Sequence, residues 1–362
     1  MHQEPEKKKT KSKQCIVTAI LISFIVLCGI VTTISLILFI KPNKTIDRIA
    51  VLRWNRSGIT IAGNTSSPGT NPYQFRNPYD LVLDLEENLY VTDRNNHRVQ
   101  KFSKGSKFGV TVAGNANGIP GNDSSSLIKC TGLTVDDDGN VYVSDHGNSR
   151  VMFWPRGSTS GIVVAGNGTY SIKLNNTLHA PYDLQRDSNT GTLYIADGYN
   201  HRIMRYLSGA SSGTQVAGGS TGGIGSTKLM YVWGFYLDLP TNSFIIANAY
   251  GSNIVRWCFG ESNWTQLAGI LGVANMTATT LIDPSDVRLD PMGNMYVADY
   301  LNHRIQFFWA GESVGTTIAG VTNQTGTNAT MLNQPSSLIF DNQLNMYVAD
   351  WYNHRIQKFL RY

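Results

Sequence analysis

The sequence predicts an all-β fold, a six-bladed β-propeller with four-stranded blades, from three observations. A phrase of the type D-x-x-N-H-R recurs every 51 or 52 residues, and a period of this size indicates an array of repeated supersecondary units. Each unit holds four short runs rich in Val, Ile and Tyr. The last unit lacks its fourth run, while one such run precedes the first unit.

The repeated phrase marks the same point in each of six units. It starts at Asp93, Asp145, Asp197, Asn248, Asp299 and Asp350. The copies at Asp145 (DHGNSRVMFW) and Asn248 (NAYGSNIVRW) are degenerate, and the other four keep the NHR triplet. The regular spacing predicts six equivalent blades.

Within a unit, the four runs follow in a constant order. The first starts near a proline, as in PYDLVLD from Pro78 to Asp84, and NLYVTD and HRVQKF come next. The fourth, such as VTVAGN, contains an Ala-Gly pair. Short runs punctuated by Gly, Asn and Asp are typical of strands joined by tight turns. No helical period is sustained in the repeats, and four-stranded units repeated radially make a propeller.

The two ends of the repeat region predict a closed ring. The last unit stops at Tyr362, after its third strand, and an unpaired fourth strand runs from Ile59 to Asn64. We expect this strand to complete the sixth blade, because an open array would expose two sheet edges that invite aggregation.

The repeat pattern resembles that of the NHL-repeat propeller family. The segments P-x-D-[LV]-x-x-D, N-x-Y-[VI]-x-D and N-H-R-[VI]-Q-x-F carry the resemblance, which extends from about Ile49 to Tyr362. Four units match well, and the second and fourth match weakly. The resemblance implies the fold and leaves the function open, because propellers include enzymes, sugar binders and scaffolds.

The N-terminal region predicts a membrane anchor. We expect a basic cytoplasmic tail over 1–14, a transmembrane signal-anchor helix over 15–40, a juxtamembrane stalk over 41–48 and the propeller over 49–362. Ile16 to Ile40 contains 25 residues without a charge or a proline, long enough to cross a hydrocarbon core of ~30 Å. A signal peptide is the alternative, but its apolar region is usually ~7–15 residues long.

Charge and glycosylation motifs predict the orientation. Five tail lysines favour a cytoplasmic N-terminus, hence a single-pass type II membrane protein whose propeller is extracellular or lumenal. Asn-x-Ser/Thr motifs fit that location, although Asn- and Thr-rich loops also produce them by chance. The candidate glycosylation sites are Asn43, Asn55, Asn64, Asn122, Asn167, Asn175, Asn263, Asn275, Asn323 and Asn328.

Charge and cysteine content argue against nucleic-acid binding and against a disulfide in the propeller. Without the five lysines and two glutamates of the tail, 25 basic and 23 acidic residues remain. This balance lacks the basic excess of a nucleic-acid-binding face. Cys15 and Cys28 belong to the membrane segment. Cys130 and Cys258 fall on non-adjacent blades, so we expect both thiols to be free.

The polar residues of the NHR phrase form a predicted structural ladder. One histidine per blade cannot converge on a zinc ion, whereas the acid can pair with the arginine across its hairpin. Each histidine is expected to pair within its own repeat. The fourth unit loses both charged partners, at Asn248 and Asn253. The ladder residues are Asp93, His97, Arg98, Asp197, His201, Arg202, Asp299, His303, Arg304, Asp350, His354 and Arg355.

The start of each first strand supplies the residues nearest the axis. Three carboxylates, Asp80, Asp183 and Asp286, alternate there with Gly132, Gly234 and Ser337. Such a ring could hold Ca²⁺, which takes six to eight oxygen ligands. The alternative is that each Asp caps its own backbone, as Asp commonly does at turns.

The starts of the six first strands, called the strand entrances below, do not carry the metal site of a related enzyme. Amidating-lyase propellers, which resemble NHL rings, place zinc-binding histidines there, whereas His179 stands alone near an entrance of this chain. The entrance residues are Tyr79, Thr131, Tyr182, Trp233, Ser285 and Ser336. The gluconolactonase-like propellers use a central calcium set with Glu and Asn, which the three Asp match only remotely. Tyr79, Tyr182 and Trp233 either line a binding face or pack between blades.

Taken together, these features predict a membrane-anchored propeller that binds or scaffolds an extracellular protein or glycan. No catalysis, no cofactor and no nucleic acid are expected. The alternative is a calcium-assisted hydrolase or lyase with its site at the mouth of the central channel, on Asp80, Asp183 and Asp286.

Overall fold

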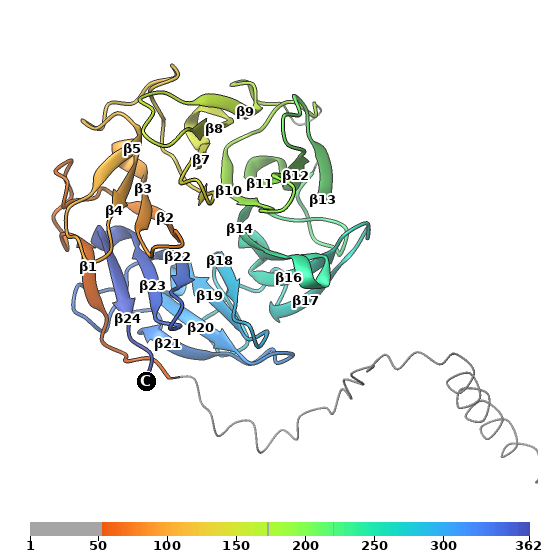
Figure 1. The fold of residues 1–362 in the computed structure, drawn as a ribbon. Coiled ribbons are helices and arrows are strands. Elements are labelled where there is room, and N and C mark those ends of the chain that lie inside the picture. The colour runs from red at the N-terminus through yellow and green to blue at the C-terminus, as the bar shows by residue number, and fades with distance from the viewer. Residues whose placement is uncertain (1–52, 172–173, 220) are drawn as a thin grey trace, which may run out of the picture. The chain divides into compact units, whose positions relative to one another are not determined.

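The computed structural model describes residues 53–171, 174–219 and 221–362, which form a ring of six antiparallel four-stranded sheets (Figure 1). The six-bladed propeller is therefore confirmed. The predicted tail, anchor and stalk lie outside the described residues, as does Asn43. Among the residues that the structure describes, no helix is long and apolar enough to span a membrane.

Each blade is numbered here by its place along the chain. Blade 1 contains β2 (Pro78–Leu83), β3 (Leu89–Asp93), β4 (Arg98–Phe102) and β5 (Val110–Gly114). Blade 2 contains β6 (Leu133–Val135), β7 (Val141–Asp145), β8 (Arg150–Trp154) and β9 (Ile162–Gly166). Blade 3 contains β10 (Pro181–Arg186), β11 (Leu193–Asp197), β12 (Arg202–Tyr206) and β13 (Thr214–Gly218).

The second half of the ring repeats this order. Blade 4 contains β14 (Val232–Asp238), β15 (Ser243–Asn248), β16 (Asn253–Cys258) and β17 (Trp264–Gly269). Blade 5 contains β18 (Pro284–Leu289), β19 (Met295–Asp299), β20 (Arg304–Phe308) and β21 (Thr316–Gly320). Blade 6 contains β22 (Pro335–Phe340), β23 (Met346–Asp350), β24 (Arg355–Phe359) and the N-terminal β1 (Ile59–Gly63).

The N-terminal strand closes the ring. β1 pairs antiparallel with β24, with Ile59 opposite Lys358 and Gly63 opposite Arg355. Trp54 extends this pairing by a bridge to Arg361 and donates its indole N–H to the Leu344 carbonyl at 2.9 Å. The predicted exchange of strands between the chain's ends is therefore confirmed.

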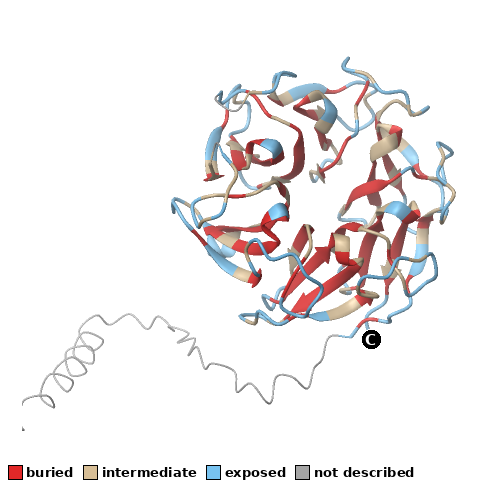
Figure 2. Ribbon diagram, turned by 180° about the vertical axis from the view of Figure 1, so that it is seen from behind, coloured by how far each residue is buried: buried red, intermediate tan, exposed pale blue. Residues whose placement is uncertain are grey.

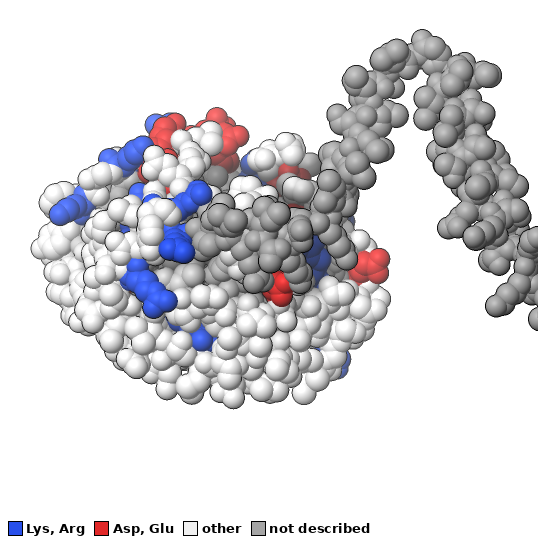
Figure 3. Space-filling view, turned by 90° about the horizontal axis from the view of Figure 1, so that it is seen from below, with Lys and Arg blue, Asp and Glu red and all other residues white. Residues whose placement is uncertain are grey.

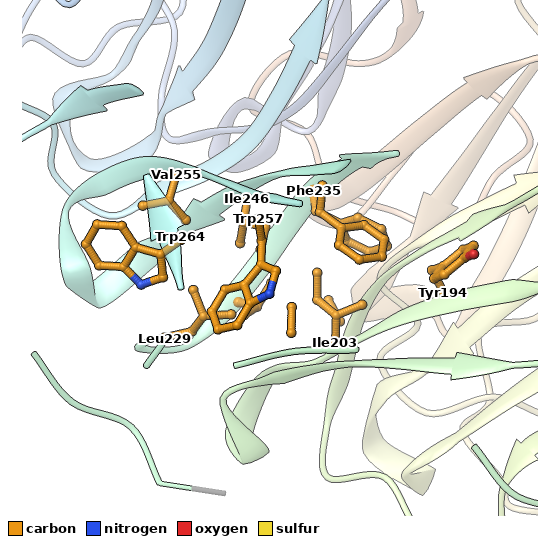
Figure 4. Close-up of a cluster of buried hydrophobic side chains, with 12 residues drawn as sticks. Tyr194, Ile203, Leu229, Phe235, Ile246, Val255, Trp257 and Trp264 are labelled. Carbon is orange, nitrogen blue, oxygen red and sulfur yellow. The ribbon is translucent and has the colours of Figure 1, made fainter. Parts of the chain in front are cut away.

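Hydrophobic side chains fill the space between neighbouring blades, as expected when each sheet is covered on both faces. All five residues of β3 are buried, whereas four of the five positions of the outermost β5 are partly or fully exposed. Figure 2 shows the same gradient from buried inner strands to exposed outer loops. Figure 4 shows one such layer, where Tyr194 and Ile203 of blade 3 face Phe235, Trp257 and Trp264 of blade 4.

A tight turn joins the second and third strands of every blade and sits at the same end of the ring as the strand entrances. Each turn is a single 3₁₀ turn followed by one residue in the left-handed backbone region, such as His97 with φ of 55°. The turns are η2 (Arg94–Asn96), η3 (His146–Asn148), η4 (Gly198–Asn200), η6 (Ala249–Gly251), η7 (Tyr300–Asn302) and η8 (Trp351–Asn353). These turns and the entrances together form the mouth of the channel.

Candidate functional site

The Asp–Arg pairs of the NHR phrase are buried inside their blades. The Asp197 carboxylate accepts the Arg202 Nε–H at 2.8 Å, the Asn200 side-chain N–H at 2.9 Å and the His179 backbone N–H at 2.6 Å. Equivalent Asp–Arg pairs occur in blades 1, 2, 5 and 6. In blade 4, Asn248 donates to Asn253 at 2.8 Å and still accepts a backbone N–H, from Met230. These residues hold the turns of the mouth in place.

The histidines of the phrase join neighbouring blades, which differs from the expected pairing within one repeat. The His97 Nδ1 accepts the backbone N–H of Lys129 in blade 2 at 2.9 Å. His201, His303 and His354 accept the N–H groups of Tyr231, Gln334 and Asn77 in the same way. An accepting Nδ1 carries no proton, and burial lowers the pKa of all four imidazoles. The interaction depends on the left-handed turn, which the repeat pattern alone does not show.

The three central aspartates also link blades. Asp80, Asp183 and Asp286 each accept the next backbone N–H of their own strand, at 2.7–2.8 Å. The second oxygen of each accepts a backbone N–H of the following blade, from Leu133, Phe235 and Leu338 respectively. Gly132 and Gly234 occupy the equivalent positions of blades 2 and 4, where the backbones of neighbouring blades come too close for a side chain. A Cβ on Gly132 would lie 2.6 Å from the Cα of Asp183.

A buried arginine supplies the positive charge at the axis. The Arg288 Nη1 lies 2.9 Å from the Asp286 carboxylate and donates to the Phe235 carbonyl at 3.1 Å. The Ser337 hydroxyl is 2.7 Å from Asp80 and 2.8 Å from Asp286. The Ser337 hydroxyl donates to both carboxyls and so links blade 6 to blades 1 and 5. Burial raises the pKa of both carboxyls.

Calcium does not fit this ring. All six oxygens of Asp80, Asp183 and Asp286 already accept a hydrogen bond or an ion pair. The space left beside them is about 10 Å³, which is about the volume that a single water requires. The predicted calcium site is therefore not formed by these residues. Across the described part of the chain, no group of three His, Cys, Asp or Glu is arranged to hold a metal ion, and the entrances carry no histidine.

The channel mouth above the aspartates contains an aromatic layer. The rings of Tyr79 and Tyr182 lie 6.0 Å apart, and Tyr182 stacks on Trp233 at 5.7 Å. Trp351 of η8 contacts both Tyr79 and Tyr300. The three entrance aromatics singled out from the sequence are thus brought together. They pack on one another and also line the mouth.

Two residues that the sequence reasoning missed complete this mouth. Arg94 places its guanidinium over the rings of Tyr79 and Trp351, 5.8 Å from each centroid. His146 lies 4.8 Å from the Tyr182 ring. Both follow the acid that ends the second strand, a position that varies from blade to blade, with Arg94, His146, Gly198, Ala249, Tyr300 and Trp351. The sequence signal for these two residues is a position that varies from blade to blade while the neighbouring positions of the repeat stay constant.

The polar groups of the mouth are unusual in lacking partners. Within the described residues, both ring nitrogens of His146, the Tyr79 hydroxyl and the Arg94 Nε are buried without a hydrogen bond. Buried polar groups are normally paired, so these groups are available to bind water or a ligand. Burial, with Arg94, Lys129 and His179 nearby, lowers the pKa of His146 to about 3. The imidazole is neutral at physiological pH. Burial raises the pKa of Tyr79 well above its usual range, so its hydroxyl stays protonated.

The remaining predicted sites lie on the surface or away from the mouth. The nine candidate glycosylation asparagines that the structure describes are all exposed. Cys130 is buried and Cys258 is exposed, and both are free. On the side of the ring drawn in Figure 3, basic and acidic side chains both occur and most of the surface is uncharged.

Comparison with known proteins supports the NHL β-propeller family. The NHL repeat model matches residues 75–102, 127–151, 281–308 and 332–359, which belong to blades 1, 2, 5 and 6. The third unit was expected to match well and the second weakly, whereas the model matches the second and not the third.

Curated relatives that the chain matches include amidating enzymes. Peptidyl-glycine alpha-amidating monooxygenase A of Xenopus laevis is 34% identical over 130 residues, covering 35% of this chain and 14% of that protein. A probable peptidyl-alpha-hydroxyglycine alpha-amidating lyase of Caenorhabditis elegans is 26% identical over 140 residues, covering 38% of this chain and 39% of that protein. The chain thus spans well under half the length of either relative.

A solved gluconolactonase shares the fold. The protein, from Xanthomonas campestris, is 12% identical and superposes with a TM-score of 0.58, covering 81% of this chain and 89% of its own. At this identity the likeness shows the fold alone.

The relatives correct the expectation that this chain is not an enzyme. That expectation rested on the missing zinc histidines and on the absence of a known catalytic motif. The relatives that the chain matches include an amidating lyase, which contradicts it. The central aspartates already have partners, whereas polar groups of the mouth do not.

Proposed function

We propose that this propeller is a lyase whose active site is the channel mouth between the entrances of blades 1, 2 and 3. The observation that carries this proposal is the half-buried, neutral His146 beside Tyr182, whose ring nitrogens have no partner, with Arg94 and the unpartnered Tyr79 hydroxyl in the same aromatic layer. A base, a proton donor and a fixed cation are the components that an acid–base elimination requires.

The relatives suggest the substrate class, a carboxylate-bearing α-hydroxyamide such as a peptidyl-alpha-hydroxyglycine. Arg94 would bind the substrate carboxylate by charge-assisted hydrogen bonds. His146 would accept the proton of the substrate hydroxyl while the C–O bond becomes C=O and the C–N bond breaks. The imidazolium of His146 would then pass this proton to the leaving nitrogen. The products are an amide and an α-oxo acid, and no proton or electron is left over.

Turnover of the full chain tests this proposal. We expect glyoxylate release from an N-acyl α-hydroxyglycine peptide, and His146→Ala should lower kcat by about 10²–10⁴-fold, the range for loss of a general base. Arg94→Gln should raise KM by about tenfold or more, because a charged hydrogen bond contributes about 1.5–3 kcal/mol.

His303→Asn is the matched control for this experiment. Asn tolerates the left-handed backbone at this position and can accept the Gln334 N–H in place of the imidazole. Its kcat should equal that of the wild type. Absence of turnover in the wild type, or full activity of His146→Ala, would reject the assignment.

We further propose that the propeller faces the extracellular or lumenal side, held by the segment 15–40. The apolar length of that segment and the five tail lysines support this topology. The exposure of nine candidate asparagines is compatible with it. A substrate or ligand on that side would be an extracellular or secreted peptide or glycan.

Expression in eukaryotic secretory cells tests the topology. Endoglycosidase treatment should increase the electrophoretic mobility of the full chain, because several motifs would carry glycans. A chain with all ten motif asparagines changed to Gln is the control and should not shift. An unchanged wild-type band, with a propeller open to cytosolic protease, would reverse the proposed orientation.

A further inference from the structure

We propose that the blade 4–5 side of the mouth binds an organic cation, a protonated amine or a quaternary ammonium group. The site, called the cation site below, consists of the carboxylate of Asp283 and the rings of Tyr231, Trp233, Tyr250 and Tyr300. The inference rests on the proposed function, because the cation would belong to the substrate whose reacting end is held by Arg94 and His146.

The four aromatic rings are in continuous contact. Tyr250 lies 4.4 Å from Tyr231 and 5.8 Å from Trp233, and Trp233 lies 5.5 Å from Tyr300 in an edge-to-face arrangement. Tyr250 is 47% exposed, so its ring is accessible to a ligand. Faces of Tyr and Trp attract cations, and quaternary ammonium groups are bound by such aromatic sets.

Asp283 provides a negative charge at this point of the ring. It precedes the first strand of blade 5, and the neighbouring Ile282 carbonyl accepts the Leu301 N–H at 3.2 Å, which holds η7 with Tyr300 against it. After burial, the Asp283 charge is the main cause that raises the pKa of Tyr250, whereas at Tyr300 it acts less than the opposite charge of Arg94. The five equivalent positions in the other blades carry no acid: Asn77, Lys129, Ala180, Tyr231 and Gln334.

The Asp283 carboxylate has no counter-ion or hydrogen-bond partner among the residues that the structure describes. Burial and the charge of Asp299 raise its pKa to about 6, so it is ionised at pH 7.5. A half-buried charge without a partner is costly, and a bound cation would remove that cost. The guanidinium of Arg94 lies over Tyr79 and Trp351, on the blade 6–1 side of the mouth, so the two ends of a substrate would meet opposite charges.

A neutral isostere distinguishes a cation from an apolar ligand. In calorimetric titrations of the full chain at pH 7.5, choline should bind at least about fivefold tighter than 3,3-dimethylbutan-1-ol, which replaces its charged nitrogen by carbon. Asp283→Asn and Tyr250→Ala should each weaken choline binding by about two- to thirtyfold, the range of a cation–π contribution.

Tyr73→Ala is the matched control. Tyr73 is 42% exposed, and its ring packs edge-to-face on Phe108, which precedes the outermost strand of blade 1 and lies away from the mouth. Choline affinity should be unchanged in this variant. Equal affinity for choline and its isostere, or an unchanged affinity in Asp283→Asn with an unchanged melting temperature, would reject the cation site.

A second measurement separates this inference from the proposed function. His146→Ala should bind choline as tightly as the wild type while its turnover falls. Choline binding that depends on Asp283, in a chain without turnover, would sustain the cation site and reject the lyase. For an active chain, an α-hydroxyglycine peptide with Lys next to the hydroxyglycine should show a higher kcat/KM than its norleucine counterpart. Asp283→Asn should bring the ratio of the two kcat/KM values to about one. A ratio near one in the wild type would reject the site.

Discussion

Asp197→Ala is expected to lower the free energy of unfolding by about 3–5 kcal/mol, the cost of removing one partner from a buried ion pair. The side chain of Asp197 is fully buried, and that of Arg202 is 4% exposed. The substitution leaves the Arg202 guanidinium in the interior without its anion. It also leaves the backbone N–H of His179 without its acceptor and removes one of the two acceptors of the Asn200 side chain, which keeps the Ser171 carbonyl. Denaturant unfolding monitored by tryptophan fluorescence measures the change.

The double change Asp197→Asn with Arg202→Asn should cost less than Asp197→Ala. Blade 4 already has this arrangement, with Asn248 donating to Asn253 and Asn253 donating to Gln266. Blade 3 offers the equivalent glutamine, since Gln215 lies opposite Met204 as Gln266 lies opposite Val255. The new Asn at 197 would also keep an acceptor for the His179 N–H.

Lys104→Ala serves as the surface control for this comparison. Lys104 pairs with Glu87 at 2.8 Å, but its side chain is 69% exposed, and exposed pairs contribute little. Its melting temperature should match that of the wild type. A double variant less stable than Asp197→Ala would contradict the interpretation of blade 4 as a neutral copy of the charged ladder.

Most of the fold could be predicted because its determinants repeat. The strand runs, the Asp–Arg pairs and the closing strand all follow from the local pattern and its period. A run of alternating or fully apolar residues can be recognised as a strand without knowing which strands lie beside it. The bridging role of His97 could not be predicted in this way. It depends on a left-handed backbone at His97 and on the N–H of Lys129, 32 residues further along the chain.

The candidate site was predicted only in part because its residues differ between blades. Tyr79, Tyr182 and Trp233 stand at one repeat offset, so the alignment of units brought them together. Arg94 and His146 stand at another offset, whose residues share no chemistry. Their importance depends on which polar atoms remain unpartnered after folding. Arg288 was hidden for a similar reason: the positions equivalent to it are Val82, Thr134, Gln185, Tyr236 and Ile339, so the pattern assigned no charge to the axis.

Deleting residues 1–64 is expected to cause aggregation of the chain when it and the full chain are both prepared in detergent. The deletion removes β1 and leaves β24 as an open edge of blade 6, with unpaired backbone groups that template association. It also removes Ala62 from the layer between blades 6 and 1. Size-exclusion chromatography and thermal unfolding report the two effects.

Two variants separate the contribution of the strand from that of the residues before it. Deleting only residues 1–48 keeps β1 and should preserve a monomeric ring with an unchanged melting temperature. Trp54→Ala keeps β1 but removes a buried ring that lies 5.4 Å from Tyr296 and 6.4 Å from Phe307, and should cost about 3–5 kcal/mol. If the chain without residues 1–64 is monomeric and melts like the chain without 1–48, β1 does not close the ring. Aggregation of the longer deletion alone would show that the pairing of β1 with β24, rather than the preceding segment, holds the first and last blades together.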